Sequence, residues 1–218
     1  TLADARALLA RYRIVCDDAV SRALDDPVNE SCKPGDAVFT RARFGIIARP
    51  RTSLDAAARL ARDAGFEVLD LGANLEGEAR DVAAEHAKLA LKARADGRKL
   101  AILSGGELTV TVRGNGRGGP NQEYALSLAS ELRNAEGVCV LAADTDGADG
   151  GAGDASDPAG AVIDNSTFRA MRALQLDPLA YLANNDATAF FTATGDLLLT
   201  GPTLTNVNDI RVILVDAV

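Results

Sequence analysis

Glycine and arginine alternate in the segment Arg113–Glu123, which reads Arg-Gly-Asn-Gly-Arg-Gly-Gly-Pro-Asn-Gln-Glu. Glycine lets backbone N–H groups approach an anion closely, and the guanidinium groups of Arg113 and Arg117 are forked donors suited to phosphate or carboxylate. A helix is expected to start near Asn121, where unpaired N–H groups and the helix dipole attract negative charge. The segment therefore predicts an anion-binding loop, and the alternative is a flexible connection between a hairpin and a helix. It is not a Gly-x-Gly-x-x-Gly turn after the first strand of a Rossmann unit, and it lacks the Lys-Ser/Thr pair of a Walker A loop.

Carboxylates and glycines gather in a second segment, Asp144–Asp154. Several carboxylates on one glycine-rich loop suit a hard divalent cation such as Mg²⁺, with Asp146 and Asp149 as the candidate ligands. The glutamate that ends an EF-hand loop is absent, so a calcium-binding loop of that kind is excluded. The alternative is a solvated acidic loop.

A third polar segment, Ser104-Gly105-Gly106-Glu107, directly follows an apolar run. Paired glycines after a buried strand allow backbone N–H groups to contact an anion. Glu107 at such a position would hold a metal-bound water or cap a turn. A tight turn that needs positive φ angles explains the glycines equally well.

The elements that must position these segments alternate between helix and strand. Continuous apolar runs predict buried strands, and apolar stripes with a period of 3.6 residues predict helices. Strands are expected at residues 44–48, 66–71, 99–103, 108–113, 137–143, 196–199 and 210–215. Helices are expected at residues 2–13, 54–64, 76–94, 121–133 and 165–173, with shorter helices up to residue 192. This order predicts an α/β fold, a layered sandwich with a mixed, largely parallel sheet. Ligands of such sheets collect beyond the carboxyl ends of the strands, where the three segments lie.

Loop-forming residues between positions 24 and 40 mark the best candidate for a domain boundary. They include Lys33-Pro34-Gly35-Asp36. We expect residues 1–40 to form a helix and a linker, and residues 41–218 to form the α/β domain.

The composition excludes several classes of function. The 218 residues include 23 lysines and arginines and 31 aspartates and glutamates, which gives a net charge of −8. A chain this acidic repels nucleic acids and anionic membranes, so neither is expected as a partner. Three widely spaced cysteines form no disulfide framework and no zinc pattern, which predicts a cytoplasmic protein.

The three segments, together with the polar run from Thr194 to Ile210, resemble the C-terminal MOFRL domain of the glycerate 2-kinase family. Members of that family are often described as hydroxypyruvate reductases of tartrate-utilisation operons. The upstream residues, including Lys33-Pro34-Gly35-Asp36, resemble the end of the family's preceding domain. The resemblance implies that family members are about twice as long, that the missing N-terminal half supplies a catalytic lysine, and that the active site lies between the two halves.

The resemblance implies ATP- and Mg²⁺-dependent phosphorylation of the 2-hydroxyl of D-glycerate. Phosphoryl transfer depends mainly on positioning and charge neutralisation. The implied catalytic residues are Arg117, Asp146, Asp149 and Glu107, with Asp146 and Asp149 also as Mg²⁺ ligands. The implied binding residues for substrate and nucleotide are Ser104, Gly105, Gly106, Gly116, Gly118, Gly119, Asn121, Gln122, Thr203, Thr205 and Asn208. The resemblance implies that many members have arginine where this chain has Pro120. Either Arg117 takes over that positive charge, or this branch of the family differs.

Two other functions remain open. One is an NAD(P)H-dependent hydroxypyruvate reductase, although the chain has no dinucleotide fingerprint after its first strand. The other is a non-catalytic module that binds a ligand or forms a homodimer. We expect the isolated chain to be weakly active or inactive as a kinase.

Overall fold

The computed structural model describes residues 1–133, 135–151 and 154–217. Ala152 and Gly153 of the predicted acidic loop, and Val218 at the end of the predicted α/β domain, lie outside the described residues. The chain divides into two compact units, residues 1–47 and 48–218. None of the described helices combines the length and the apolarity that crossing a bilayer requires.

The first unit is helical and has no core of its own. It contains the helices α1 (Leu2–Tyr12) and α2 (Asp18–Asp25) and two short 3₁₀ helices, Pro27–Asn29 and Ala37–Arg41. The side chain of Thr1 caps α1 and that of Asp17 caps α2, which explains where both helices start. No residue of these four helices is buried.

The strand predicted at residues 44–48 is absent, and that prediction is wrong. Phe44 is 91% exposed and Ile47 is 100% exposed, and in the described chain this apolar run pairs with no strand. Apolar character alone does not produce a strand, because a strand also needs a neighbouring strand that satisfies its backbone hydrogen bonds.

The second unit is built on one mixed sheet. Within the described residues the strand order is β1-β3-β8-β5-β6-β7. The strands are β1 (Glu67–Asp70), β3 (Leu100–Gly106), β5 (Val138–Asp144), β6 (Gly160–Ile163), β7 (Leu197–Leu198) and β8 (Asp209–Val215). A separate short pair is formed by β2 (Gly77–Glu78) and β4 (Leu108–Thr109).

The balance of parallel and antiparallel pairs differs from the prediction. The α/β class and the mixed sheet are confirmed, but among the described strands of the large sheet only β1 and β3 pair in parallel. The reason is the position of β8. β3 and β5 run in the same direction, as expected for two strands joined through a helix, but β8 lies between them and is antiparallel to both.

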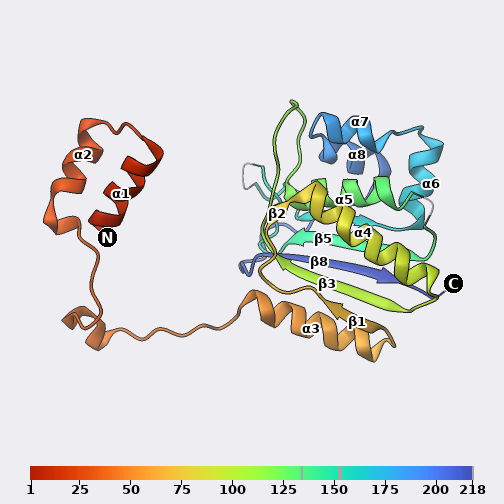
Figure 1. Cartoon of the computed structure of the whole chain (residues 1–218), viewed down its shortest axis with the longest axis horizontal. Coiled ribbons are helices and arrows are strands. Elements are labelled where there is room, and N and C mark those ends of the chain that lie inside the picture. The colour runs from red at the N-terminus through yellow and green to blue at the C-terminus, as the bar shows by residue number, and fades with distance from the viewer. Residues whose placement is uncertain (134, 152–153, 218) are drawn as a thin grey trace. The chain divides into compact units, whose positions relative to one another are not determined.

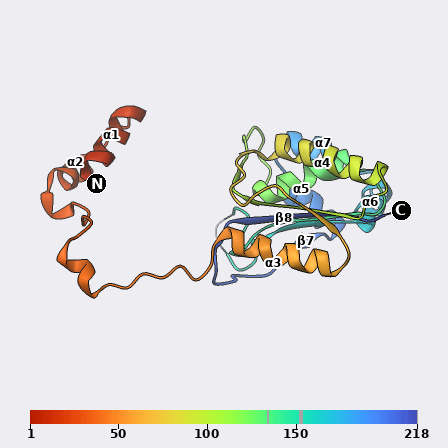
Figure 2. The same cartoon turned by 60° about the horizontal axis from the view of Figure 1, so that its bottom comes forward.

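Helices cover both faces of this sheet and confirm the layered architecture (Figures 1 and 2). One face carries α3 (Pro50–Asp63), and the other carries α4 (Ala79–Ala95) and α5 (Pro120–Glu131). The helices α6 (Asn165–Ala173), α7 (Pro178–Ala183) and α8 (Ala187–Thr194) complete the second layer. Residues 121–130 of α5 are all buried, because α5 lies between the sheet and the helices α4, α7 and α8.

A buried histidine joins α4 to α5. His86 is 5% exposed, and its Nδ1 lies 2.7 Å from the hydroxyl of Tyr124. Burial, with a smaller contribution from the positive charge of Arg211, lowers the pKa of His86 to about 4. This agrees with the sequence, in which His86 lies on the apolar stripe of its helix.

The free energy of unfolding is expected to fall when the pH drops from 6.5 to 4, in part because of His86. The unfolded chain takes up a proton at His86 near pH 6.5, whereas the folded chain resists protonation until about pH 4. The contribution of His86 is therefore present above pH 6.5, and about 2 kcal/mol of it is lost by pH 4.5. Urea unfolding at pH 7.5 and 4.5 should show a smaller pH effect in His86→Gln than in the natural chain. Equal pH effects in both proteins would contradict the prediction.

Candidate functional site

Three segments meet at one edge of the large sheet. Gly106 at the end of β3 and Asp144 at the end of β5 both pair with Asp209 at the start of β8. The amide of Asn121, in the first turn of α5, donates a hydrogen bond of 2.8 Å to the carboxylate of Asp209. The end of the glycine-rich loop, the end of β3 and the acidic segment are thus brought together as the sequence predicts.

The glycine-rich loop is held by a tripeptide, Asn184–Asp186, that lies about 70 residues further along the chain. The side-chain oxygen of Asn185 accepts hydrogen bonds from the N–H groups of Arg113 (2.7 Å) and Gly114 (3.0 Å). Three further N–H groups, those of residues 115, 116 and 117, donate to the Asn184 side chain, the Asn184 carbonyl and the Asp186 carboxylate. These five N–H groups are therefore occupied and do not form the predicted anion cradle. The side chains of Arg113 and Arg117 remain exposed.

The sequence suggests only a helix cap for this tripeptide, and its larger role was missed. Asn185 is 5% exposed and adopts a left-handed backbone conformation with φ of 52°. Its amide nitrogen donates to the buried carboxylate of Glu123, which also binds the Nε of Arg80 at 2.6 Å. The one signal in the sequence is the asparagine itself, since asparagine tolerates left-handed conformations and can both donate and accept.

Close packing explains the glycines of this loop better than ligand binding does. A Cβ atom on Gly116 would collide with Asp186, and one on Gly119 would collide with the backbone and side chain of Asp149. Gly118, also a predicted binding residue, lies against Ala187. The loop therefore needs glycine because other segments lie directly against its backbone.

The segment Ser104–Gly106 is part of β3 and does not form a ligand-binding loop. All three residues are buried, and the N–H of Gly105 donates to the carbonyl of Gly72 at 2.8 Å. A Cβ atom on Gly106, whose φ is +101°, would collide with Leu75. Only Glu107 of this predicted group is exposed.

Asp149 caps α5 and is not placed to bind a metal. It is 3% exposed, and its two carboxylate oxygens accept from the backbone N–H groups of Asn121 (2.9 Å) and Gln122 (2.8 Å). The side-chain amides of the same two residues also donate to it. Burial raises the pKa of Asp149 to about 6, against the opposing effect of these hydrogen bonds. Asn121, Gln122 and Asp149 thus satisfy one another and leave little for a ligand.

Replacing Asp149 by alanine is expected to lower the free energy of unfolding by about 2–3 kcal/mol, since it removes a helix cap and leaves buried donors unpaired. Asp146→Ala is the matched control on the same loop, because Asp146 is half-buried and a smaller change is expected there. Urea unfolding of both variants measures the difference. A larger loss in Asp146→Ala would contradict the assigned role of Asp149.

Asp146 lies with the predicted threonines. It lines a cavity of 370 Å³ together with Thr205 and Asn206, and its carboxylate accepts from the Asn206 amide at 3.2 Å. The N–H of Thr203 donates to the backbone carbonyl of Asp146 at 3.0 Å. Asn208 stays close to the same loop, because its carbonyl accepts from the hydroxyl of Thr145 at 2.8 Å.

Asp144 is a further acidic residue of this region that the sequence analysis did not single out. Burial raises the pKa of Asp144 to about 6, and the negative charges of Asp146 and Asp209 act in the same direction. The signal in the sequence is the position of Asp144 directly after the apolar run of residues 138–143, which places it where a buried strand ends. In the described part of the chain, no three His, Cys, Asp or Glu side chains are arranged to hold a metal ion.

Arg117 lies beside a different cavity. This cavity has a volume of 490 Å³ and is also lined by Asn115, Asp186 and Thr188. The backbone of Arg117 is fixed on both sides, by the Asp186 carboxylate at 3.1 Å and by the N–H of Thr188 at 2.9 Å. Arg117 and Asp146 therefore share an edge of the sheet but not one cavity of the described residues.

One known family matches the part of the chain that carries these segments. The MOFRL family matches residues 100–209, which is just over half of the 218 residues and includes all three segments. The chain belongs to the MOFRL family.

Relatives of this MOFRL chain include enzymes with two different names. A D-glycerate 2-kinase of Thermotoga maritima is 36% identical over 99% of the chain, which covers 50% of that relative. An Agrobacterium vitis protein with the provisional name hydroxypyruvate reductase is 45% identical, over 99% of the chain and 49% of its own length. The crystal structure of the Thermotoga maritima glycerate kinase superposes with a TM-score of 0.80, covering 99% of this chain and 50% of that one. The chain spans about half the length of the curated relatives it matches.

A buried arginine of the MOFRL chain links the start of α5, the end of β3 and Asp209. Arg211 is 1% exposed, and its guanidinium contacts the carboxylate of Asp209 at 2.9 Å and the side-chain oxygen of Asn121 at 3.2 Å. It also donates to the carbonyl of Gly106 at 3.0 Å. The sequence analysis missed this residue, although its place in the alternation of β8 puts it on the same face as Ile213 and Val215, which are core residues.

Proposed function

We propose that the chain is the C-terminal part of a D-glycerate 2-kinase, which transfers a phosphoryl group from ATP to the 2-hydroxyl of D-glycerate. The family membership and the kinase names among the relatives support this proposal. The observation that carries it is the sheet edge at the start of α5. The exposed Arg117 precedes α5 in the chain, and the half-buried Asp146 precedes Asp149, which caps α5.

The residues at this edge can neutralise the charge of the transferred phosphoryl group and orient the substrate. Arg117 is the proposed cation for the transferred phosphoryl group or for the glycerate carboxylate, since its backbone is fixed while its side chain is exposed. Glu107 and Thr205, both exposed, are proposed to orient ligands by hydrogen bonds.

A magnesium ion held jointly by Asp146 and Asp149 does not fit the structure. Asp149 is 3% exposed and each of its oxygens accepts two hydrogen bonds, whereas Asp146 is half-buried, accepts one hydrogen bond on each oxygen and lines a cavity. We propose that Asp146 alone faces an ATP-bound Mg²⁺.

The proposal extends to the organisation of the chain. Residues 1–40 are proposed to be the end of a preceding domain, and residues 41–218 the MOFRL-containing domain, whereas the compact units divide at residues 47 and 48. We propose a cytoplasmic location, in which the three free thiols stay reduced. Formation of a homodimer is a further proposal, which size-exclusion chromatography would test.

The second candidate function is an NAD(P)H-dependent hydroxypyruvate reductase. The name of the Agrobacterium vitis relative favours it. Gly114, Gly116 and Gly119 have the glycine spacing of a dinucleotide-binding turn, but they follow β4 and not the first strand of the sheet. The N–H groups of Gly114 and Gly116 are also occupied by Asn185 and Asn184, which favours the kinase.

Enzyme assays separate these functions. The protein encoded by the complete gene should form 2-phosphoglycerate from ATP, Mg²⁺ and D-glycerate, and the isolated chain should do so weakly or not at all. Oxidation of NADH that depends on hydroxypyruvate, without phosphoglycerate formation, would replace the kinase proposal with the reductase. Ligand binding without either reaction in the complete protein would indicate a non-catalytic module.

A further inference from the structure

Four arginines surround a cavity at the opposite end of the sheet from the candidate site. The cavity has a volume of 730 Å³, which lies within the range of small-molecule sites. It is lined by Arg94, Arg133, Ala135, Glu136, Asn165, Phe168, Arg169 and Arg172. Ala135 and Glu136 precede β5, whereas Asp144 ends it, so about 20 Å of strand separates this cavity from the acidic segment.

The charges of this cavity are unbalanced. Glu136 is the one carboxylate among the described residues that line it. In the parts of the chain that the structure describes, none of the four arginines forms an ion pair. Asp164 lies near Arg169, but its carboxylate already caps α6 through Ser166 and Thr167. A concentration of positive charge is unusual in a chain with a net charge of −8, and it attracts anions.

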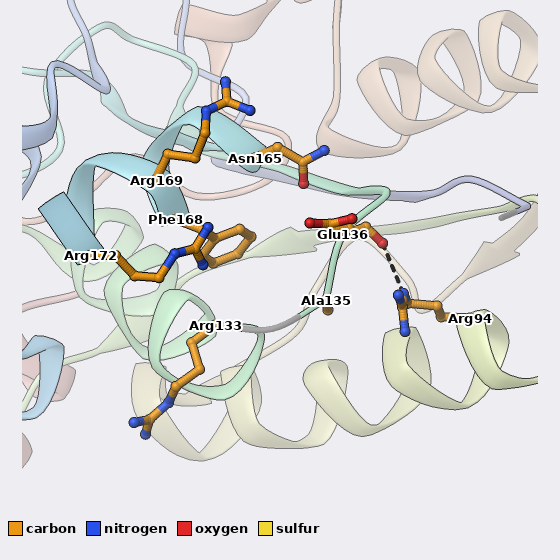
Figure 3. Close-up of a pocket in the computed structure, with 8 residues that line it drawn as sticks. All are labelled: Arg94, Arg133, Ala135, Glu136, Asn165, Phe168, Arg169 and Arg172. Atoms are coloured by element: carbon orange, nitrogen blue, oxygen red, sulfur yellow. Dashed lines mark hydrogen bonds between the residues drawn. The ribbon is translucent and has the colours of Figure 1, made fainter.

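Two of the guanidinium groups are anchored in a way that leaves their terminal nitrogens available. The Nε of Arg94 donates to the carbonyl of Glu136 at 2.8 Å, and the Nε of Arg133 donates to the carbonyl of Ser130 at 3.0 Å. Figure 3 shows Arg94 on one side and Arg133, Arg169 and Arg172 on the other, with Phe168 and Glu136 between them. An anchored guanidinium binds phosphate or carboxylate at a lower entropic cost than a free one, because its orientation is already fixed.

Helix ends account for part of this pattern but not for all of it. Arg94 and Arg172 lie in the last turns of α4 and α6, where positive charge stabilises the helix dipole. Arg169 lies in the middle of α6, where that explanation does not apply. The helix dipole also does not explain why arginines of α4 and α6, together with Arg133 just after α5, line the same cavity.

We propose that this cavity is a second binding site, for a small polyanion that carries at least two phosphate or carboxylate groups. The spread of the four arginines suits an extended ligand better than a single phosphate ion. The buried ring of Phe168, 3% exposed, forms the apolar base of the site. The proposal does not depend on the kinase reaction, because the site lies at the other end of the sheet.

Titration calorimetry of the chain in 150 mM NaCl tests the proposal, with tripolyphosphate, citrate and inorganic phosphate as probes. Tripolyphosphate or citrate should bind at least tenfold more tightly than inorganic phosphate. Comparing the affinity for tripolyphosphate with that for citrate distinguishes a site for phosphate groups from a site for carboxylates. The double variant Arg169→Ala/Arg172→Ala should weaken this binding at least tenfold. Both side chains are exposed on the surface of α6, so the fold should persist, and circular dichroism checks this.

Two control variants test whether a loss of polyanion binding is specific to this cavity. Arg59→Ala/Arg62→Ala removes the same charge from exposed positions of α3 and should leave binding unchanged. Arg117→Ala alters the candidate site and should also leave binding unchanged. Equal weakening in the α3 control, weakening in Arg117→Ala alone, or no polyanion binding below 1 mM would overturn the proposal.

Discussion

Replacing Arg117 by alanine is expected to lower the kcat/KM of the complete enzyme for D-glycerate by about 10²–10³. This is the usual loss when one fixed donor that faces the developing charge of a transition state is removed. Arg117 suits that role because its backbone is held by Asp186 and Thr188 while its guanidinium is exposed. The measurement is the initial rate of 2-phosphoglycerate formation over a range of D-glycerate and ATP concentrations.

Two further variants decide whether the position of Arg117 matters or only its charge. Arg113→Ala removes the same group from the same loop, but Arg113 lines another cavity with Glu78 and Asp81, so a smaller loss is expected. The resemblance to glycerate kinases places an arginine at Pro120 in many members. If Arg117 replaces that arginine, Arg117→Ala/Pro120→Arg should recover at least tenfold of the lost activity. An unchanged rate in Arg117→Ala would remove this residue from the site.

Much of the fold could be predicted because its signals are local. The apolar runs of β3, β5 and β8 and the helical stripe of α4 locate those elements to within a few residues. The placement of β8 between β3 and β5 could not be predicted, since an antiparallel C-terminal strand fits equally well at either edge. The exposed run at residues 44–48 shows the limit of local signals. Its apolar residues predict a strand, but the run has no partner strand and forms none.

The candidate site was predictable in its location but not in its division of roles. A segment rich in glycine, asparagine and aspartate has the same composition whether its residues bind a ligand or bind one another. In the structure, the carboxylate of Asp149 binds Asn121 and Gln122. The tripeptide at residues 184–186 accepts hydrogen bonds from the N–H groups of the glycine-rich loop. Those contacts link residues about 28 and 70 positions apart, so no local pattern reveals them.

Replacing the buried Arg211 by methionine is expected to lower the free energy of unfolding by about 3–5 kcal/mol, the usual effect of removing one partner of a buried ion pair. The change leaves the carboxylate of Asp209, 7% exposed, without its cation, and it leaves the carbonyl of Gly106 and the side-chain oxygen of Asn121 without a donor. Methionine fills a similar volume, so the loss reports the hydrogen bonds and the charge rather than an empty cavity. Urea unfolding followed by circular dichroism measures it.

A double-mutant cycle isolates the part of this loss that belongs to the ion pair. Asp209→Asn removes the negative charge that Arg211 neutralises, so Arg211→Met/Asp209→Asn should be more stable than the sum of the single losses predicts. Because the network ties the start of α5 and the end of β3 to β8, Arg211→Met should also weaken D-glycerate phosphorylation by the complete enzyme. Additive losses in the cycle would show that Arg211 acts through its other contacts and not through the charge of Asp209. These contacts are its hydrogen bonds with Gly106 and Asn121 and its packing against Tyr124, whose ring centre lies 5.6 Å from the guanidinium carbon.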